Sequence, residues 1–182
     1  MRFILIGFKS SGKTTLGRSI SKNLSVEFFD LDELIEKKYS HDNGEIISFR
    51  EIFRRIGESN FRNLENRLLE EYISLDSCII SLGGGTLDEG RNRELLGDCC
   101  IVYVRVPIED LLVRIEKIGY PSYLDSSDDP EKELRSLFSI RKSIYEEISH
   151  LVIDNPNSID FEKLILDSSR KISNLMQNNE SN

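Results

Sequence analysis

The chain carries a glycine-rich loop directly after its first apolar run. Residues 3–6 read as a short buried strand, and the loop that follows is Gly7-Phe8-Lys9-Ser10-Ser11-Gly12-Lys13-Thr14. It matches the pattern GxxxxGK[ST], which indicates phosphate binding where it joins a strand to a helix. Residues 13–24 have the apolar spacing of an amphipathic helix. We call residues 7–14 the phosphate loop, and its position favours an α/β fold with a ligand site at the end of the first strand.

The residue types of the phosphate loop suit a nucleotide. Glycine permits the tight turn, backbone N–H groups point inward, and the following helix contributes its positive end. We expect Lys13 to reach the β- and γ-phosphates of ATP, and the Thr14 hydroxyl to be a ligand of Mg²⁺. Lys9 is expected to be a solvated side chain. The residues expected to bind the nucleotide phosphates are Ser10, Ser11, Gly12, Lys13, Thr14 and Thr15.

Apolar runs alternate with segments of helical periodicity along the rest of the chain. Continuous apolar runs are typical of parallel strands that helices bury on both faces. The sequence therefore predicts a doubly wound five-stranded parallel sheet flanked by helices, in a single domain over residues 1–176 with a loose tail at 177–182. The expected strands are 3–6, 26–29, 78–82, 101–104 and 151–153, and the expected helices are 13–24, 31–38, 48–72, 88–96, 108–115, 129–148 and 158–176.

Local signals modify this pattern at two places. Residues 48–51 have the spacing of a capping box, which favours a helix start there. Gly57 is expected to break the long segment 48–72 into two helices. Residues 117–128 lack periodicity and contain glycine and proline, so they are predicted to form a mobile loop.

Charge and composition limit the partners. The net charge is −8 and no basic stripe interrupts it, which excludes a general nucleic-acid role. No run approaches the roughly 18 apolar residues that a membrane span needs, and residues 1–6 are too short for a signal peptide. The three cysteines lack metal-ligand spacing and read as buried free thiols. We therefore expect a cytoplasmic monomer with a small-molecule substrate and with no nucleic-acid or membrane partner.

Two carboxylates follow the second apolar run. The segment reads Phe28-Phe29-Asp30-Leu31-Asp32. Side chains alternate along an extended chain, so the two acids point apart and can do different work. One could order water on Mg²⁺ and the other could accept the proton of an attacking hydroxyl. The alternative is that Asp32 caps the next helix and Asp30 is only a polar strand end.

Three further segments follow the acidic strand end along the chain. They are Gly57-Glu58-Ser59-Asn60-Phe61-Arg62-Asn63-Leu64-Glu65, Ser81-Leu82-Gly83-Gly84-Gly85 and Arg141-Lys142-Ser143-Ile144-Tyr145. Together with the phosphate loop and the acidic strand end, their order and spacing resemble the shikimate kinase family from Met1 to about Lys171.

The resemblance implies a fold and an activity. The fold would be of the nucleoside-monophosphate-kinase type, with substrate-binding helices at about 31–72 and a mobile lid at about 117–128. The activity would be transfer of the γ-phosphoryl group of ATP to a hydroxyl of shikimate, which gives 3-phosphoshikimate and ADP. ATP and Mg²⁺ are the implied cofactors, and shikimate is the implied substrate.

The resemblance also implies roles for particular residues. Asp32 would contact the substrate hydroxyls and act in catalysis, and Asp30 would hold Mg²⁺ through water. Arg62 and Arg141 would hold the substrate carboxylate, a task for which the forked donors of arginine are suited. The glycines of 83–85 would let the ligand approach the backbone, where Gly84 offers an N–H group. We expect Glu65, one helical turn after Arg62, to fix the rotamer of that arginine.

The lid segment departs from the family pattern. The family carries an arginine immediately before a proline there, and this arginine reaches the transferring phosphoryl group, whereas Tyr120 occupies that position in this chain. Three interpretations follow: slow turnover, supply of the charge by Lys117, which we favour, or lost or changed chemistry. Arg114 resembles the residue that stacks on adenine, and Asn155 and Pro156 resemble the loop on the other side of the base.

Two other functions remain open at this point. One is a kinase for another small polyol acid such as gluconate, or for a nucleoside monophosphate. Such relatives are not expected to combine the Arg62 segment with the glycine triplet. The other is a catalytically weak nucleotide-binding sensor, which only Tyr120 recommends.

Overall fold

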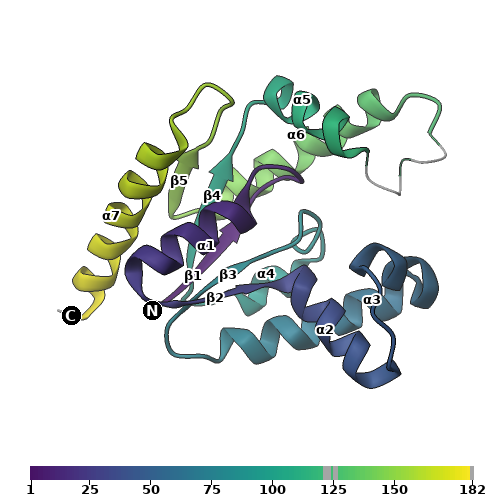
Figure 1. Cartoon of the computed structure of the whole chain (residues 1–182), viewed down its shortest axis with the longest axis horizontal. Coiled ribbons are helices and arrows are strands. Elements are labelled where there is room, and N and C mark those ends of the chain that lie inside the picture. The colour runs from purple at the N-terminus through teal and green to yellow at the C-terminus, as the bar shows by residue number, and fades with distance from the viewer. Residues whose placement is uncertain (121–123, 125–126, 181–182) are drawn as a thin grey trace.

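Five parallel strands form one sheet at the centre of the molecule (Figure 1). The computed structural model describes residues 1–120, 124 and 127–180. The strands lie in the order β2-β3-β1-β4-β5, so the first strand of the chain lies in the middle of the sheet. Their bounds are β1 (Arg2–Ile6), β2 (Glu27–Asp30), β3 (Cys78–Ser81), β4 (Cys100–Arg105) and β5 (Leu151–Asp154).

Helices connect the strands, as the alternating pattern predicts. Each of the five predicted apolar runs forms a strand, and each predicted helical segment contains a helix. The helices are α1 (Lys13–Leu24), α2 (Leu31–Asn43), α3 (Phe49–Ile73), α4 (Gly90–Leu95), α5 (Ile108–Ile118), α6 (Pro130–Ile148) and α7 (Phe161–Glu180). Among the described residues, no helix has the length and apolarity that crossing a bilayer requires.

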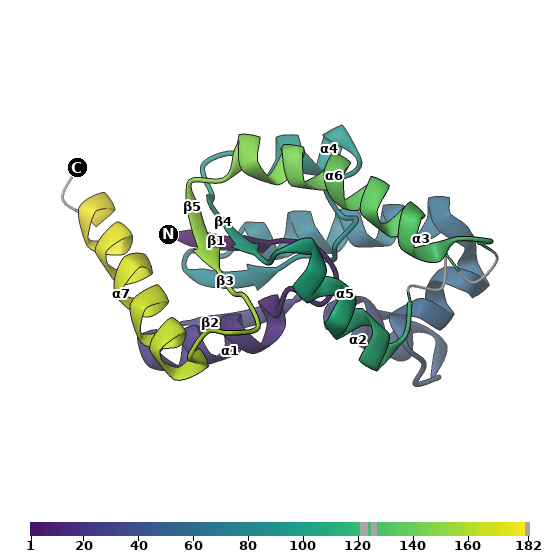
Figure 2. The ribbon, with the colours of Figure 1, turned by 90° about the horizontal axis from the view of Figure 1, so that it is seen from above.

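Both faces of the sheet are buried by helices (Figure 2). Successive side chains of β1 point to opposite faces, because the side-chain period of a strand is two. Phe3 and Leu5 belong to the cluster that includes α1 and α7, whereas Ile4 and Ile6 belong to the cluster that includes α2, α3 and α6. This explains why residues 3–6 of the strand are apolar without interruption, and it confirms the doubly wound arrangement.

Three helices differ in detail from a simple reading of the apolar pattern: one contains a break, and two extend beyond their predicted ends. In α3, Gly57 has φ 77° and ψ 164°, so the predicted break inside the long segment is confirmed. Helix α2 continues to Asn43, beyond its predicted end at residue 38, and stops where Gly44 adopts φ 72°. Helix α7 continues to Glu180 and so includes residues 177–180, which the sequence predicts as part of a loose tail. The end of that segment, 181–182, lies outside the described residues.

The carboxyl ends of the parallel strands meet at one edge of the sheet. β1 leads into the phosphate loop, β2 ends in Asp30, and β3 leads into the glycines of 83–85. β5 ends directly before Asn155. Because all strands run in the same direction, these four segments gather at the same edge, where open α/β sheets bind their ligands.

Candidate active site

The phosphate loop folds around the ammonium group of Lys13. This group donates to the carbonyl oxygens of Gly7 at 2.9 Å and Phe8 at 3.0 Å, and the side chain is buried. Burial lowers the pKa of Lys13 to about 8, while the nearby carboxylates of Asp32 and Asp30 oppose this shift. The loop therefore holds one buried cation at its centre, which suits an anionic ligand.

One polar atom of the loop has no partner within the described part of the chain. The Ser10 hydroxyl is buried and makes no hydrogen bond, and Ser10 has a positive φ of 65°. Buried polar side chains are nearly always hydrogen-bonded in proteins, so this hydroxyl indicates a ligand that the loop would bind. A phosphate oxygen fits, because the hydroxyl can donate to it beside the backbone N–H groups.

The residues predicted to flank the adenine hold the phosphate loop in place. Arg114 donates to the carbonyl of Ser10 at 3.2 Å and to that of Asn155 at 2.7 Å. Asn155 in turn donates to the carbonyl of Ser11 at 2.8 Å. A Cβ atom on Gly12, whose φ is 88°, would lie 2.8 Å from Asn155 Nδ2, so only glycine fits there. The structure thus brings Arg114 and Asn155 to the loop, where they support its backbone.

Thr14 and Asp30, the predicted magnesium residues, contact each other. The Thr14 hydroxyl donates to Asp30 Oδ2 at 2.6 Å, and the other Asp30 oxygen accepts from the N–H of Asp32 at 3.1 Å. Within the described residues no group of three or more His, Cys, Asp or Glu side chains could hold a metal by itself. Oxygen donors from one or two side chains fit Mg²⁺, which usually completes its shell with water and phosphate oxygens.

Asp32 lies between the phosphate loop and the glycine triplet. A Cβ atom on Gly83 would lie 3.1 Å from Asp32 Oδ1, and the Asp32 charge acts on Lys13. Burial raises the pKa of Asp32 to about 7, and the neighbouring carboxylates of Asp30 and Glu65 add to the shift. A carboxylate with such a pKa can accept a proton near neutral pH, which is the property of a general base.

The two predicted carboxylate-binding arginines converge on Gly85. A Cβ atom there would lie 2.9 Å from Arg141 Nη2 and 3.3 Å from Arg62 Nη2. Arg62 donates to Glu65 at 2.8 Å, and the buried Glu65 also accepts from the Thr86 hydroxyl at 2.7 Å. The expectation that Glu65 fixes the rotamer of Arg62 is therefore confirmed by geometry. The absence of a side chain at residue 85 leaves room for both guanidinium groups.

The glycine triplet packs directly on the phosphate loop. A Cβ atom on Gly84 would lie 3.1 Å from the backbone nitrogen of Lys9. The Tyr145 hydroxyl donates to the Gly84 carbonyl at 2.6 Å, which explains why an aromatic residue follows Arg141 one turn later on α6. The phosphate loop and the glycine triplet are thus closely packed.

Two lysines lie near the lid segment in the structure, Lys117 and Lys9. Lys117 lies exposed in the last turn of α5, with no contact to the phosphate loop among the interactions of the described residues. Lys9 is half-buried, and its ammonium donates to the Gly119 carbonyl at 3.1 Å in an exposed position. Tyr120 packs against the cluster around Phe8. The rest of the predicted lid at 121–123 and 125–126 lies outside the described residues.

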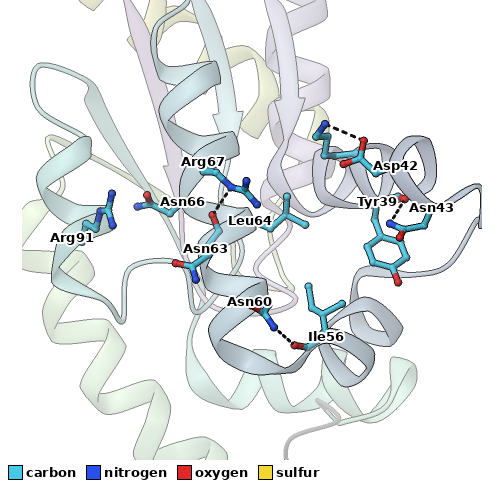
Figure 3. A pocket seen from close by; sticks show the side chains of 11 residues that line it. Tyr39, Asp42, Asn43, Ile56, Asn60, Asn63, Leu64, Asn66, Arg67 and Arg91 are labelled. Atoms are coloured by element: carbon cyan, nitrogen blue, oxygen red, sulfur yellow. Dashed lines mark hydrogen bonds and ion pairs between the residues drawn. The ribbon is translucent and has the colours of Figure 1, made fainter.

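A cavity of about 680 Å³ lies away from these residues, between α2 and α3 (Figure 3). None of the predicted site residues lines it. Its Asn66 donates to Asn92 at 2.6 Å, and Asn92 donates to the Thr86 carbonyl at 2.7 Å. Because Thr86 also binds Glu65, this chain of bonds fixes α3, α4 and the glycine triplet to one another. The residues that line the cavity are Lys38, Tyr39, Asp42, Asn43, Ile56, Asn60, Asn63, Leu64, Asn66, Arg67 and Arg91.

Comparison with known proteins decides the family. The family model described as shikimate kinase matches residues 9–172. A shikimate kinase of Marinomonas sp. (strain MWYL1) is 34% identical over 154 residues, which cover 83% of this chain and 81% of that protein. The chain belongs to the shikimate kinase family. It is thus a kinase that uses ATP, and the resemblance on which the site residues rest is confirmed at the level of the family.

Solved structures agree with the fold of this shikimate kinase family member. The structure titled "Shikimate kinase from Acinetobacter baumannii in complex with shikimate" is 31% identical with a TM-score of 0.80, covering 98% of this chain and 93% of that chain. A deoxyadenosine kinase from M. mycoides, 17% identical with a TM-score of 0.59, covers 96% of this chain and 100% of its own and shares the fold alone. The predicted kinase-type α/β fold is therefore confirmed.

Proposed function

We propose that this protein transfers the γ-phosphoryl group of ATP to a hydroxyl of shikimate, giving 3-phosphoshikimate and ADP. The observation that carries the proposal is the convergence of Arg62 and Arg141 on Gly85, beside Asp32 and the phosphate loop. Two forked cations suit the planar carboxylate of a hydroxy acid, and Asp32 suits one of its hydroxyls. Membership of the shikimate kinase family supports the same acceptor.

The chain's own groups divide the work of the transfer between them. Arg62 and Arg141 would hold the acceptor's carboxylate, which fixes the position of its hydroxyls. Asp32 would accept the proton of the attacking hydroxyl, and Lys13 would bind the phosphoryl oxygens whose charge develops during transfer. Thr14 and Asp30 would hold Mg²⁺, whose charge would offset that of the β- and γ-phosphates.

An acceptor screen tests this function. Purified protein with Mg²⁺ and ATP is given shikimate, gluconate or a nucleoside monophosphate, and ADP formation is followed by a coupled assay. We expect shikimate-dependent turnover, with removal of Mg²⁺ by a chelator abolishing it. Turnover only with another acceptor would show that this acceptor, and not shikimate, is the substrate. ATP binding without turnover on any acceptor would indicate a sensor instead of an enzyme.

The pH profile should show the titration of Asp32. Only the ionised carboxylate can accept a proton, and its pKa is about 7 because of burial and of the neighbouring carboxylates. As the pH rises from about 6 to about 8 the ionised fraction grows, so kcat/KM for shikimate is expected to rise through an inflection near 7. A carboxyl ¹³C titration of Asp32 checks the assignment. A flat profile over this range would contradict the role of Asp32 as the base.

Lys117→Ala tests the proposed source of the lid charge. If Lys117 reaches the transferring phosphoryl group, we expect kcat to fall about tenfold, less than for a preorganised donor because the side chain is exposed and flexible. Lys142→Ala, on an exposed lysine of α6, serves as the matched control and should leave kcat unchanged. An unchanged kcat in Lys117→Ala, with a loss in Lys9→Ala, would assign the charge to Lys9 instead.

A further inference from the structure

Asp88 forms a two-bond ion pair with one of the substrate-site arginines. Its carboxylate accepts from Arg141 Nε at 2.9 Å and from Arg141 Nη2 at 2.5 Å. The Arg141 side chain is 9% exposed and the Asp88 side chain is 40% exposed. A fork of this kind fixes the orientation of both groups. The chain therefore supplies its own carboxylate to an arginine that is expected to bind a substrate carboxylate.

The Asp88 carboxylate lies where the two arginines converge. A Cβ atom on Gly85 would lie 3.3 Å from Asp88 Oδ2, the same distance as from Arg62 Nη2. This is the place in which the proposed function puts the acid group of the acceptor. Asp88 thus presents, from within the protein, the chemical group that the arginine pair recognises.

The charges of this region are balanced before a substrate arrives. Arg62 is paired with Glu65, and Arg141 is paired with Asp88. A bound hydroxy acid adds a third carboxylate to two guanidinium groups, and like charges this close repel one another. The affinity for the acceptor is therefore highest if one of the internal carboxylates moves away from its arginine.

Of the two internal carboxylates, that of Asp88 can rotate away from its arginine. Glu65 is 2% exposed and is also held by the Thr86 hydroxyl, so it is fixed on both oxygens. Asp88 accepts hydrogen bonds from Arg141 alone among the described residues, and its exposed fraction lets it turn to water. Arg141 keeps a second support, because its guanidinium lies 5.6 Å from the centre of the Phe8 ring.

We propose that Asp88 is an internal competitor for the acceptor's carboxylate and so sets the affinity of the site for acidic substrates. The proposal rests on the function proposed above. In the free enzyme the Asp88 carboxylate occupies Arg141, and acceptor binding exchanges it for the carboxylate of the substrate. Because this exchange costs part of the binding free energy, only an acceptor that also engages other groups of the site displaces Asp88 readily.

The test is Asp88→Asn, which keeps the shape and removes the charge. We expect KM for shikimate to fall about threefold to tenfold, with kcat and KM for ATP unchanged. Glu89→Gln is the matched control, because Glu89 is the neighbouring exposed acid and has no ion pair or hydrogen bond through its side chain among the described residues. Its KM for shikimate should stay the same. The methyl ester of shikimate lacks the charge, so its inhibition constant should be equal in the unaltered protein and in Asp88→Asn.

Several outcomes would overturn this proposal alone. One is a KM for shikimate that is unchanged or higher in Asp88→Asn. Another is an equal fall in the KM for shikimate in Glu89→Gln. A third is an equal fall in the inhibition constant of the methyl ester in Asp88→Asn. If the variant does not fold, the Asp88 carboxyl ¹³C signal of the unaltered protein gives the answer, since it should shift on addition of shikimate, and no shift would refute the exchange. Failure of the unaltered protein to phosphorylate shikimate would instead overturn the proposed function.

Discussion

Replacing Lys13 with alanine is expected to lower kcat/KM by about 100- to 1,000-fold. Its ammonium is the buried cation of the phosphate loop and lies within hydrogen-bond distance of two loop carbonyls. A preorganised charge of this kind costs no reorganisation when negative charge develops on the transferring group, and water cannot replace it in a buried position. Steady-state kinetics with varied ATP and shikimate measures the loss.

Lys13→Met separates charge from packing in the same position. It keeps an unbranched side chain of similar length, so we expect it to be as inactive as Lys13→Ala while the loop stays filled. Because both variants remove the ammonium that donates to the Gly7 and Phe8 carbonyls, melting curves of both are compared with that of the unaltered protein to show that the loss of activity is not a loss of folding. Retention of more than about a tenth of the activity by Lys13→Met would contradict the assigned role.

Asp32→Asn is expected to lower kcat by about 100- to 10,000-fold while the affinity for Mg²⁺ and ATP stays nearly the same. The amide has the shape of the carboxylate but cannot accept the proton of an attacking hydroxyl. The proposed nucleotide contacts are those of other groups, namely the phosphate loop and Thr14 and Asp30, which are hydrogen-bonded to each other. Stopped assays measure kcat, and calorimetry with a non-hydrolysable ATP analogue measures nucleotide affinity.

Glu33→Gln provides the matched control for Asp32→Asn. Glu33 is the next residue of α2, is 41% exposed and pairs with Arg18 outside the site. Exposed pairs contribute little to stability, so this variant should keep full activity. Loss of nucleotide binding together with activity in Asp32→Asn would contradict the division of roles between Asp30 and Asp32.

The sequence predicts the sheet well because its strands are buried on both faces. The run 101–104 is continuously apolar and the run 78–82 is interrupted only by Ser81, and the structure places strands at Cys78–Ser81 and Cys100–Arg105. The end of α2 was harder to predict, because residues 39–43 are mostly polar and exposed and show no apolar period. The cap at Gly44 is the signal that could have extended the helix to its observed end.

Site residues could be predicted where they lie in a local sequence motif. They could not be predicted where only the tertiary fold brings them to the site. Lys13, Thr14 and Arg62 lie in motifs whose spacing carries the chemistry. Asp88 has no such signal, because its partner Arg141 is 53 residues away in the sequence and only the fold brings the two together. The same holds for Lys9, whose contact with Gly119 spans 110 residues. Long-range contacts of this kind depend on the three-dimensional path of the chain.

The order of the strands has a consequence for how the two reactants meet. The phosphate loop follows β1 and the glycine triplet follows β3, and these strands are hydrogen-bonded neighbours in the middle of the sheet. Neighbouring strands lie about 4.8 Å apart, a spacing that the backbone ladder holds within narrow limits. In the proposed function, phosphoryl donor and acceptor are therefore aligned chiefly by the pairing of β1 with β3, and a substitution that shifts this pairing should misalign them although it touches neither ligand.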